Sequence, residues 1–233
     1  MIRCPVCKRQ ISVKYRIGWD GEVVDWFHCF CGTVFHTKGI DKGYFNEAYL
    51  KKWQEMKEVE ERFEYLTRTY LSLIEDLTYG RKFLDVGFTL PIHIKNLAKR
   101  GWITTGIDLI KNDYITGDFE EYKFPDKFDF ILLGHCLESF NRPFEAIKKA
   151  YDLLNNYGIL MITTPNPEII LMTGLGEFGH WNYKEKWVFI SKHKLKEMVC
   201  KVGFKWVLAR RNISQRYVSW NDLHLILQKV ENG

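Results

Sequence analysis

From Arg81 onward the sequence alternates between short apolar runs and amphipathic segments, and this alternation constrains the fold more than any other feature of the chain. The apolar runs have the length of buried strands, and the segments between them have apolar residues at helical spacing. Such a pattern predicts an α/β fold, in which a mostly parallel sheet has helices on both faces. The expected strands are FLDVG, WITTGIDL, ITGDF, FDFILLG, YGILMITT, FKWVLARR and DLHLILQKV, and the expected helices span residues 91–100, 142–154 and 190–204.

The amino-terminal part has a different character, because four of the six cysteines lie in it: Cys4, Cys7, Cys29 and Cys31. The two residues inside CPVC make a turn that points both sulfurs of the first pair at one ion, and HCFCG supplies a second pair. Four thiolates fill the tetrahedron of a zinc ion and leave no position for water. The pattern therefore predicts a structural zinc ion in a small ribbon.

Two alternatives at this cluster stay open. His28 and Cys31 have the same three-residue offset as Cys4 and Cys7, so His28 could replace Cys29 as the fourth ligand. Thiolates are favoured in structural zinc sites, which supports Cys29. A disulfide is the other alternative, and a reducing compartment disfavours it.

The ribbon is too small to be stable without its metal, so zinc is expected to supply the missing stability. After it, charged and aromatic residues follow a helical pattern as far as Gly80. We therefore expect a zinc ribbon in residues 1–40, a helical connector in residues 41–80 and the sheet domain in residues 81–233. The two remaining cysteines, Cys136 and Cys200, are expected in the core.

The charge and hydropathy of the chain exclude few classes of function. A net charge of +5 is compatible with a nucleic acid or an acidic substrate, but the lysines and arginines are spread along the chain, which favours an ordinary solvated surface. No run approaches the roughly 18 apolar residues of a membrane span, and the start MIRCPVCKRQ lacks the apolar core of a signal peptide. The expected location is therefore the cytoplasm, with no membrane partner.

Four motifs occur in a familiar order: FLDVGFTLP, TGIDL, TGDFEEYKFPDKFDFILLGHCLESFNRP and NNYGILMITTPNP. With them, the stretch from Arg81 to Val230 resembles a class I S-adenosylmethionine-dependent methyltransferase, a Rossmann-like fold of seven strands in which the seventh runs antiparallel. CPVC, HCFCGTVF and YFNEAYLKKW likewise resemble the zinc ribbon and tyrosine-rich helix with which many relatives begin. The resemblance implies that residues 81–233 form a methyltransferase-like domain.

The loop FLDVGFTLP departs from the family pattern, because Thr89 and Pro91 occupy the second and third glycine positions. A dinucleotide would fit poorly, since its pyrophosphate needs backbone N–H groups that Pro91 lacks. S-adenosylmethionine has no phosphate, and Asp85 and Gly87 can still receive its amino-acid end. The competing interpretation is a plain strand end.

The resemblance implies a set of cofactor-binding residues: Asp85, Gly87, Phe88, Asp108, Asp118, Phe119, Gly134 and His135. Asp108 would accept the ribose hydroxyls, with a helix N-cap as the alternative role. Asp118 would accept the adenine amino group with Phe119 packed on the ring, although an Asx turn also explains this aspartate. His135 is a candidate base, and a neutral hydrogen-bonding histidine is its alternative.

Methyl transfer from a sulfonium needs no fixed catalytic residue, because the enzyme can work by holding the nucleophile opposite the methyl group. The segment GLGEFGHWNYKEKW combines glycines with aromatic residues and is expected to cover the substrate. His180 is its one candidate acid or base, with an exposed loop histidine as the alternative.

The sequence thus favours a zinc-ribbon-bearing methyltransferase that uses S-adenosylmethionine and a structural zinc ion. A small-molecule acceptor is favoured, although the scaffold itself does not name one. Two alternatives stay open. One is a methyltransferase-fold binding or regulatory protein without turnover, and the other is a nucleic-acid-binding module led by the ribbon.

Overall fold

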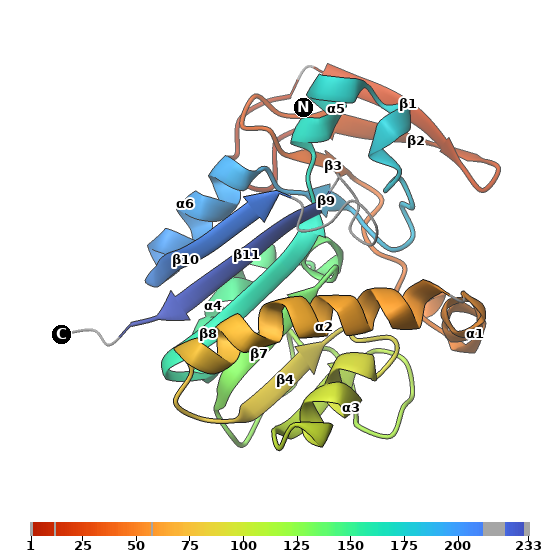
Figure 1. The fold of residues 1–233 in the computed structure, drawn as a ribbon. Coiled ribbons are helices and arrows are strands. Elements are labelled where there is room, and N and C mark those ends of the chain that lie inside the picture. The colour runs from red at the N-terminus through yellow and green to blue at the C-terminus, as the bar shows by residue number, and fades with distance from the viewer. Residues whose placement is uncertain (1, 12, 57, 212–221, 231–233) are drawn as a thin grey trace.

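A computed structural model describes residues 2–11, 13–56, 58–211 and 222–230, and its centre is a seven-stranded sheet (Figure 1). Its strands are, in spatial order, β10 (Phe204–Arg211), β11 (Asp222–Lys229), β8 (Leu154–Pro165), β7 (Phe128–Gly134), β4 (Lys82–Val86), β5 (Ile103–Asp108) and β6 (Ile115–Thr116). The strands from β8 to β6 pair in parallel, and β11 pairs antiparallel with both β8 and β10. The predicted Rossmann-like sheet, including its antiparallel seventh strand, is confirmed.

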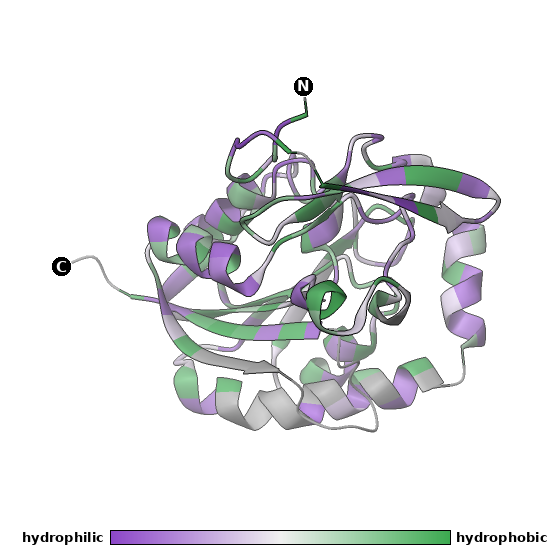
Figure 2. Cartoon of the chain, turned by 90° about the horizontal axis from the view of Figure 1, so that it is seen from above, coloured by the Kyte–Doolittle hydropathy of each residue, from purple (hydrophilic) through white to green (hydrophobic). Residues whose placement is uncertain are grey.

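Helices cover both faces of this sheet because successive strand residues point to opposite sides. Phe83 of β4 packs on the side of α2 (Glu58–Leu77) and α3 (Ile92–Lys99), where Ile74 and Ile94 are buried. The adjacent Leu84 packs in the core that also holds residues of α4 (Pro143–Leu153) and α6 (Lys192–Val202). Figure 2 shows hydrophobic colour along the central strands and mixed colour along the helices, as this layering requires.

A second, four-stranded sheet combines residues from distant parts of the sequence. Its order is β1 (Val13–Trp19), β2 (Glu22–His28), β3 (Val34–His36) and β9 (Val188–Phe189). The first three strands lie in the predicted ribbon, residues 1–40, and β9 is added to them from a later part of the chain. Because β3 pairs with β9, the ribbon segment shares a sheet with residues that follow β8 in the chain.

The connector contains the short 3-10 helix η1 (Lys42–Tyr44) and the helix α1 (Glu47–Glu55) before α2. Asn46 caps α1 by accepting hydrogen bonds from the backbone N–H groups of Ala48 and Tyr49, which are two of the donors that the first helical turn leaves unpaired. Three further short helices follow: η2 (Leu137–Ser139), α5 (Glu168–Thr173) and η3 (Gly176–Phe178).

The two isolated cysteines have different environments. Cys136 is buried as predicted, but Cys200 is exposed, so its prediction as a core residue is wrong. The helical period explains the difference: in α6 the inward face is formed by Leu195, Met198 and Val199, and the next residue turns toward solvent.

Within the described ranges, every helix is either too short or too polar to cross a lipid bilayer.

Gly106 of β5 is expected to be a sensitive packing position. A Cβ atom there would lie 2.5 Å from Ile94 Cδ1 and 2.6 Å from Phe88 Cδ1, and both side chains are buried and cannot swing away. Gly106→Ala should lower the free energy of unfolding by about 1–3 kcal/mol, measured by urea denaturation. Gly176→Ala is the control, because nothing lies within 4 Å of the added atom, and its stability should stay within about 0.5 kcal/mol of the wild type. A Gly106→Ala protein as stable as this control would contradict the packing described here.

Candidate active site

Two adjoining cavities, of about 230 Å³ and about 90 Å³, open beside the carboxyl ends of the parallel strands. This edge is where ligands bind in open α/β sheets. The cavities share four lining residues: Tyr49, Gly87, Thr89 and His135. The larger cavity extends from these residues under α2 and α3, and the smaller one extends toward the ends of β5 and β6.

All eight residues that the sequence analysis assigned to a cofactor lie around these two cavities. The larger cavity is lined by Asp85, Gly87, Phe88, Gly134 and His135, and the smaller by Gly87, Asp108, Asp118, Phe119 and His135. They come from four different strand ends or the loops that follow them, so the parallel sheet is what brings them together.

The loop after β4 is closely packed, although Thr89 and Pro91 stand where the family pattern has glycines. Gly87 has φ +67°, and a Cβ atom there would lie 2.9 Å from Cys136 Cβ. Thr89 has φ +49°, a left-handed conformation that is costly for a β-branched residue. The backbone N–H of Thr89 donates to Asp108 Oδ2 at 2.9 Å, which fixes this conformation. Strain of this kind concentrates at ligand sites.

The carboxyl groups of Asp85 and Asp108 are both buried, with 1% and 7% of the residue exposed. Burial, and then the neighbouring Asp108, raises the pKa of Asp85 well above its ordinary value. Burial also raises the pKa of Asp108, although the N–H groups of Ile110 and Thr89 partly oppose this. Within the part of the chain that the structure describes, Asp85 Oδ2 has no hydrogen-bond partner. A buried acceptor of this kind suits a cationic ligand group that approaches from the larger cavity.

Asp118 makes two contacts that the sequence did not resolve. Its Oδ1 accepts a hydrogen bond from the Glu120 N–H at 2.9 Å, so the Asx turn is present. Its Oδ2 forms an ion pair with Lys42, which brings η1 to the rim of the smaller cavity. Phe119 is buried beside it, with its ring centroid 5.7 Å from that of Phe140.

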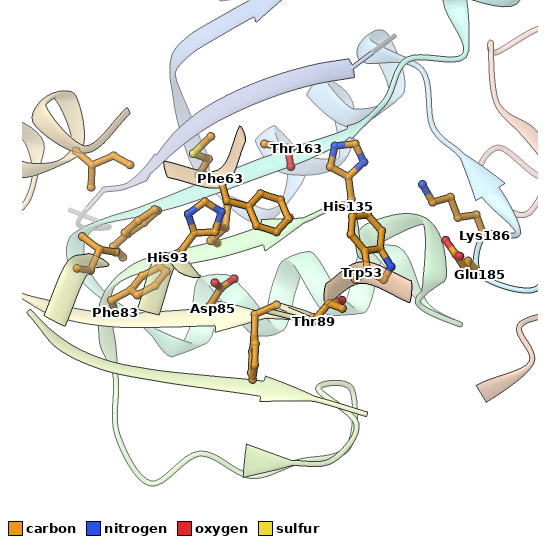
Figure 3. A pocket seen from close by; sticks show the side chains of 18 of the residues that line it. Trp53, Phe63, Phe83, Asp85, Thr89, His93, His135, Thr163, Glu185 and Lys186 are labelled. Carbon is orange, nitrogen blue, oxygen red and sulfur yellow. The ribbon is translucent and has the colours of Figure 1, made fainter. Parts of the chain in front are cut away.

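Several lining residues were not predicted from the sequence. Tyr49 and Trp53 of α1 and Phe63 of α2 supply aromatic walls to the larger cavity, and Glu185 and Lys186 supply charged groups. Figure 3 shows His135, Glu185 and Lys186 gathered at one end of this cavity, with Phe83 at the other. The four-residue spacing of Tyr49 and Trp53 was a usable signal, because it puts both rings on one helix face.

A buried group of charged side chains lies at the polar end of the larger cavity. His135 Nε2 is 3.4 Å from Asp222 Oδ2, and His135 Nδ1 is 3.7 Å from Glu138 Oε1. Lys186 Nζ is also 3.7 Å from Glu138 Oε1. Burial lowers the pKa of His135, but the carboxylates of Asp222 and Glu138 outweigh burial and raise this pKa to about 9. His135 is therefore a cation at neutral pH and is not available there as a base.

His180 belongs to the same group and has the opposite protonation state. Its Nε2 is 3.5 Å from Asp222 Oδ1, and its side chain is 18% exposed, so it is not an exposed loop histidine. Burial, together with the nearby charge of Lys186, lowers the pKa of His180 to about 3. The two histidine rings are 6.2 Å apart, and their different surroundings leave one charged and the other neutral.

The segment that carries Glu185 and Lys186 is held between the ribbon sheet and η2. His36 of β3 contacts the Lys186 carbonyl oxygen through Nε2 at 2.9 Å, and Ser139 Oγ donates to the Glu185 carbonyl at 2.6 Å. The next residue, Trp187, donates its backbone N–H to the Glu138 carbonyl at 3.1 Å. The amino-terminal sheet therefore fixes one wall of the candidate active site.

The four amino-terminal cysteines form one compact cluster, in which all four sulfur atoms lie within 4.8 Å of one another. The Cys4 and Cys31 sulfurs are 3.8 Å apart, and those of Cys7 and Cys29 are 3.4 Å apart. The hydrogen bond between Cys4 and Cys31 lowers the pKa of Cys31 to about 4, which favours a thiolate there. His28 instead places its Nδ1 2.8 Å from the Tyr15 hydroxyl, so the geometry favours Cys29 as the fourth member of the cluster.

Solved structures with a similar fold include several methyltransferases. A chain in the Haloferax volcanii complex of a methyltransferase activator with a putative methyltransferase is 10% identical, with a TM-score of 0.63 over 83% of this chain and 99% of that one. Magnesium protoporphyrin IX methyltransferase of Synechocystis PCC 6803, solved with bound S-adenosylhomocysteine, is 15% identical, with a TM-score of 0.59 over 81% and 97%. The 1,6-didemethyltoxoflavin-N1-methyltransferase of Burkholderia thailandensis is 11% identical, with a TM-score of 0.58 over 94% and 100%.

At sequence identities of 10–15%, the similarity to these structures shows a shared fold and nothing more. No curated protein matches the sequence. A family model described as a methyltransferase domain does match, over residues 59–209, which is more than half of the chain. The matched residues include nearly all of α2, the loop after β4 and, at the polar end of the larger cavity, His135, His180 and Lys186, but not Asp222. The protein is therefore a member of this methyltransferase domain family.

Proposed function

We propose that this protein is an S-adenosylmethionine-dependent methyltransferase that acts on a small molecule. The observation that carries the proposal is a pair of buried carboxyl groups in a chain of the methyltransferase domain family: Asp85 lines the larger cavity and Asp108 lines the smaller cavity that adjoins it. Together the cavities fall at the lower end of the roughly 300–1,000 Å³ typical of small-molecule sites.

The residues present suit the parts of this cofactor. The buried Asp85 Oδ2, which lacks a partner among the described residues, matches the ammonium of the methionine end. Each oxygen of Asp108 already accepts one backbone N–H and keeps a lone pair that could receive a ribose hydroxyl. Asp118 and Phe119 line the smaller cavity, where they would meet the adenine ring. When bound, the cofactor supplies an electrophilic methyl group, and the protein supplies orientation and a dry pocket.

We also propose that Cys4, Cys7, Cys29 and Cys31 hold a structural zinc ion. Tetrahedral Zn²⁺ with Zn–S bonds of about 2.3 Å requires sulfur atoms about 3.8 Å apart, close to the spacings of this cluster. The cluster anchors β2 and β3, and Ser191 Oγ donates to the Cys31 carbonyl at 2.7 Å. The metal would therefore stabilise the sheet that ends in β9 as well as the predicted ribbon.

Asp108→Ala should weaken binding of S-adenosylhomocysteine about tenfold to a hundredfold, because it removes a charged acceptor for two ribose hydroxyls. Calorimetric titration measures the affinity. The matched control is Asp113→Ala, an exposed aspartate in the following loop, which should bind as the wild type does. If wild-type protein gives neither heat nor a thermal shift with the cofactor or its product at millimolar concentration, the cofactor proposal fails and a scaffold without turnover replaces it.

Metal analysis of the purified protein should return about one zinc per chain, and Cys4→Ser should lose it. The same variant should show faster amide hydrogen exchange in β3 and β9, because the two strands are paired. Cys200→Ser is the control, since this cysteine is exposed on α6 and outside the cluster. A folded, zinc-free wild type with a disulfide between Cys4 and Cys7 would refute the metal site.

A further inference from the structure

Two segments of the chain are rich in basic residues and nearly free of acidic ones. Residues 1–19 contain five lysines and arginines and no carboxylate, and residues 192–205 contain five lysines and one glutamate. The two segments thus carry ten cations and one carboxylate, whereas the whole chain has a net charge of only +5. The rest of the molecule is therefore net negative, and the excess of positive charge is confined to these two segments.

The fold brings the two segments together, although they lie near opposite ends of the chain. Ser191, which caps α6, donates through Oγ to the Cys31 carbonyl at 2.7 Å, and a Cβ atom on Gly32 would lie 2.7 Å from Ser191 Cβ. The Cys31 sulfur is in turn 3.8 Å from that of Cys4. Figure 1 shows the ribbon loops beside the amino end of α6. Residues 2–11 and α6 therefore form one basic face.

Most of the positive charge on this basic face is unpaired. Lys14 and Arg16 lie within 3.4 Å of Asp25, and Lys194 pairs with Glu197. Six other exposed cations form no ion pair within the described ranges: Arg3, Lys8, Arg9, Lys196, Lys201 and Lys205. A zinc ion with four thiolates would add a charge of about −2, which these six cations outnumber.

An exposed aromatic ring lies on the same face. Phe30 stands between Cys29 and Cys31, and 86% of it is exposed. The Gly32 N–H donates to the Cys29 carbonyl at 2.8 Å, which closes the turn that carries the ring. Phe30 therefore buries little apolar surface within the fold, and contact with a partner would bury the rest.

We propose that this basic face binds single-stranded nucleic acid, with phosphates along the six unpaired cations and a base stacked on Phe30. Lysine and arginine contacts to phosphate supply affinity without sequence preference. Stacking on an aromatic side chain suits a single strand, because its bases can expose their flat faces. No residue of the basic face lines either cavity, so this inference goes beyond the proposed methyl transfer and does not depend on it.

An anionic membrane and an acidic protein are weaker matches to this face. Membrane binding increases with the apolar area that enters the lipid, and one exposed ring supplies little of it. Carboxylates of a protein would pair with the lysines but would leave the ring without a flat partner. A nucleic acid offers both groups, a phosphate and an aromatic base, in every nucleotide.

Fluorescence anisotropy with a labelled uridine oligomer of about 15 nucleotides measures the binding. About four phosphate contacts predict a slope near −2.8 for log K against log salt, so the affinity should fall about fiftyfold between 50 and 200 mM potassium chloride. A thymidine oligomer of equal length should bind within about threefold, and a duplex at least about fivefold more weakly, because its bases are already stacked. No binding of either oligomer at 50 mM salt, or a duplex bound as tightly as the single strand, would overturn the proposal.

The cations are tested by a variant that combines Arg9→Gln, Lys196→Gln and Lys201→Gln. It should bind the uridine oligomer at least about tenfold more weakly at low salt, and the salt slope should become shallower by about 1 to 2. The matched control combines Lys95→Gln, Lys99→Gln and Lys111→Gln, which removes the same charge from exposed positions on α3 and after β5. The control should bind as the wild type does. Equal losses in the two variants would indicate attraction by net charge alone and would overturn the site.

The ring is tested separately, with thermal unfolding of each variant measured in parallel. Phe30→Ala should weaken binding of the uridine oligomer about tenfold, whereas binding of heparin, a polyanion without bases, should change less than about twofold. Phe30→Tyr keeps a ring and should bind as the wild type does, and Phe30→Leu replaces the alanine variant if that protein is unstable.

Three competing ligands decide whether nucleic acid is the right class: heparin, polyglutamate, and vesicles of phosphatidylserine and phosphatidylcholine. Each should bind the wild type at least about tenfold more weakly than the uridine oligomer does, because none of them offers a base to Phe30. If any of them binds as tightly as the oligomer, or if a folded Phe30→Ala protein binds the oligomer as the wild type does, the assignment to single-stranded nucleic acid is wrong.

Discussion

The strand β11 lies between β8 and β10 and runs against both, and most of the site's polar geometry depends on that pairing. Because the strand is reversed, its first residue, Asp222, lies at the same edge as the last residues of the parallel strands and pairs with Pro165 of β8. There its fully buried carboxylate meets His135, which follows β7, and His180, which follows η3. A parallel seventh strand would have put this residue at the opposite edge of the sheet.

Burying Glu138 and Asp222 carries a large desolvation cost, which only close countercharges can offset. The structure provides them within 4 Å, as His135 and Lys186. Thr164 adds a hydrogen bond to Glu138 Oε2 at 3.1 Å. One consequence is structural: the loop after β7, η2, the segment 185–187 and the start of β11 must all be in place for these charges to be paired. Another is the separation of the two histidines into a charged and a neutral ring.

The amino-terminal sheet contributes to the site through the same segment that carries Lys186. His36 contacts this segment through its side chain at the Lys186 carbonyl and through its backbone N–H at the Trp187 carbonyl. On the other side, η2 holds the segment through the Ser139 hydroxyl and the Glu138 carbonyl, and β9 continues it into the ribbon sheet. The predicted ribbon is thus structurally continuous with a wall of the larger cavity. On the other side of the site, η1 and α1 supply Lys42 and Tyr49 to the rim. The segments before the sheet domain therefore help to build the site.

The sequence by itself determined the elements and most of the residues that we propose to hold the cofactor. Alternating apolar runs predicted the seven strands. The resemblance to class I methyltransferases assigned cofactor roles to residues at the ends of β4, β5 and β7, which a parallel sheet brings to one edge. The CPVC and HCFCG motifs likewise predicted one cysteine cluster, since their spacing is local. These features depend on residues that are near one another in the chain, so the local sequence pattern is enough to predict them.

Only the tertiary structure showed which side chains form the other walls of the larger cavity and its polar end. Asp222 is 87 positions from His135 in the sequence. The segment DLHLILQKV predicts only a buried strand that begins at Asp222, and it does not indicate a contact with either histidine. Glu138, Lys186, Tyr49 and Trp53 were likewise missed, and Cys200 was wrongly assigned to the core. The addition of β9 to the ribbon sheet has no signal in its two residues. The physical reason is the same in each case: these contacts depend on how distant elements pack and on which way a helix or strand faces, and the sequence pattern of one segment does not contain that information.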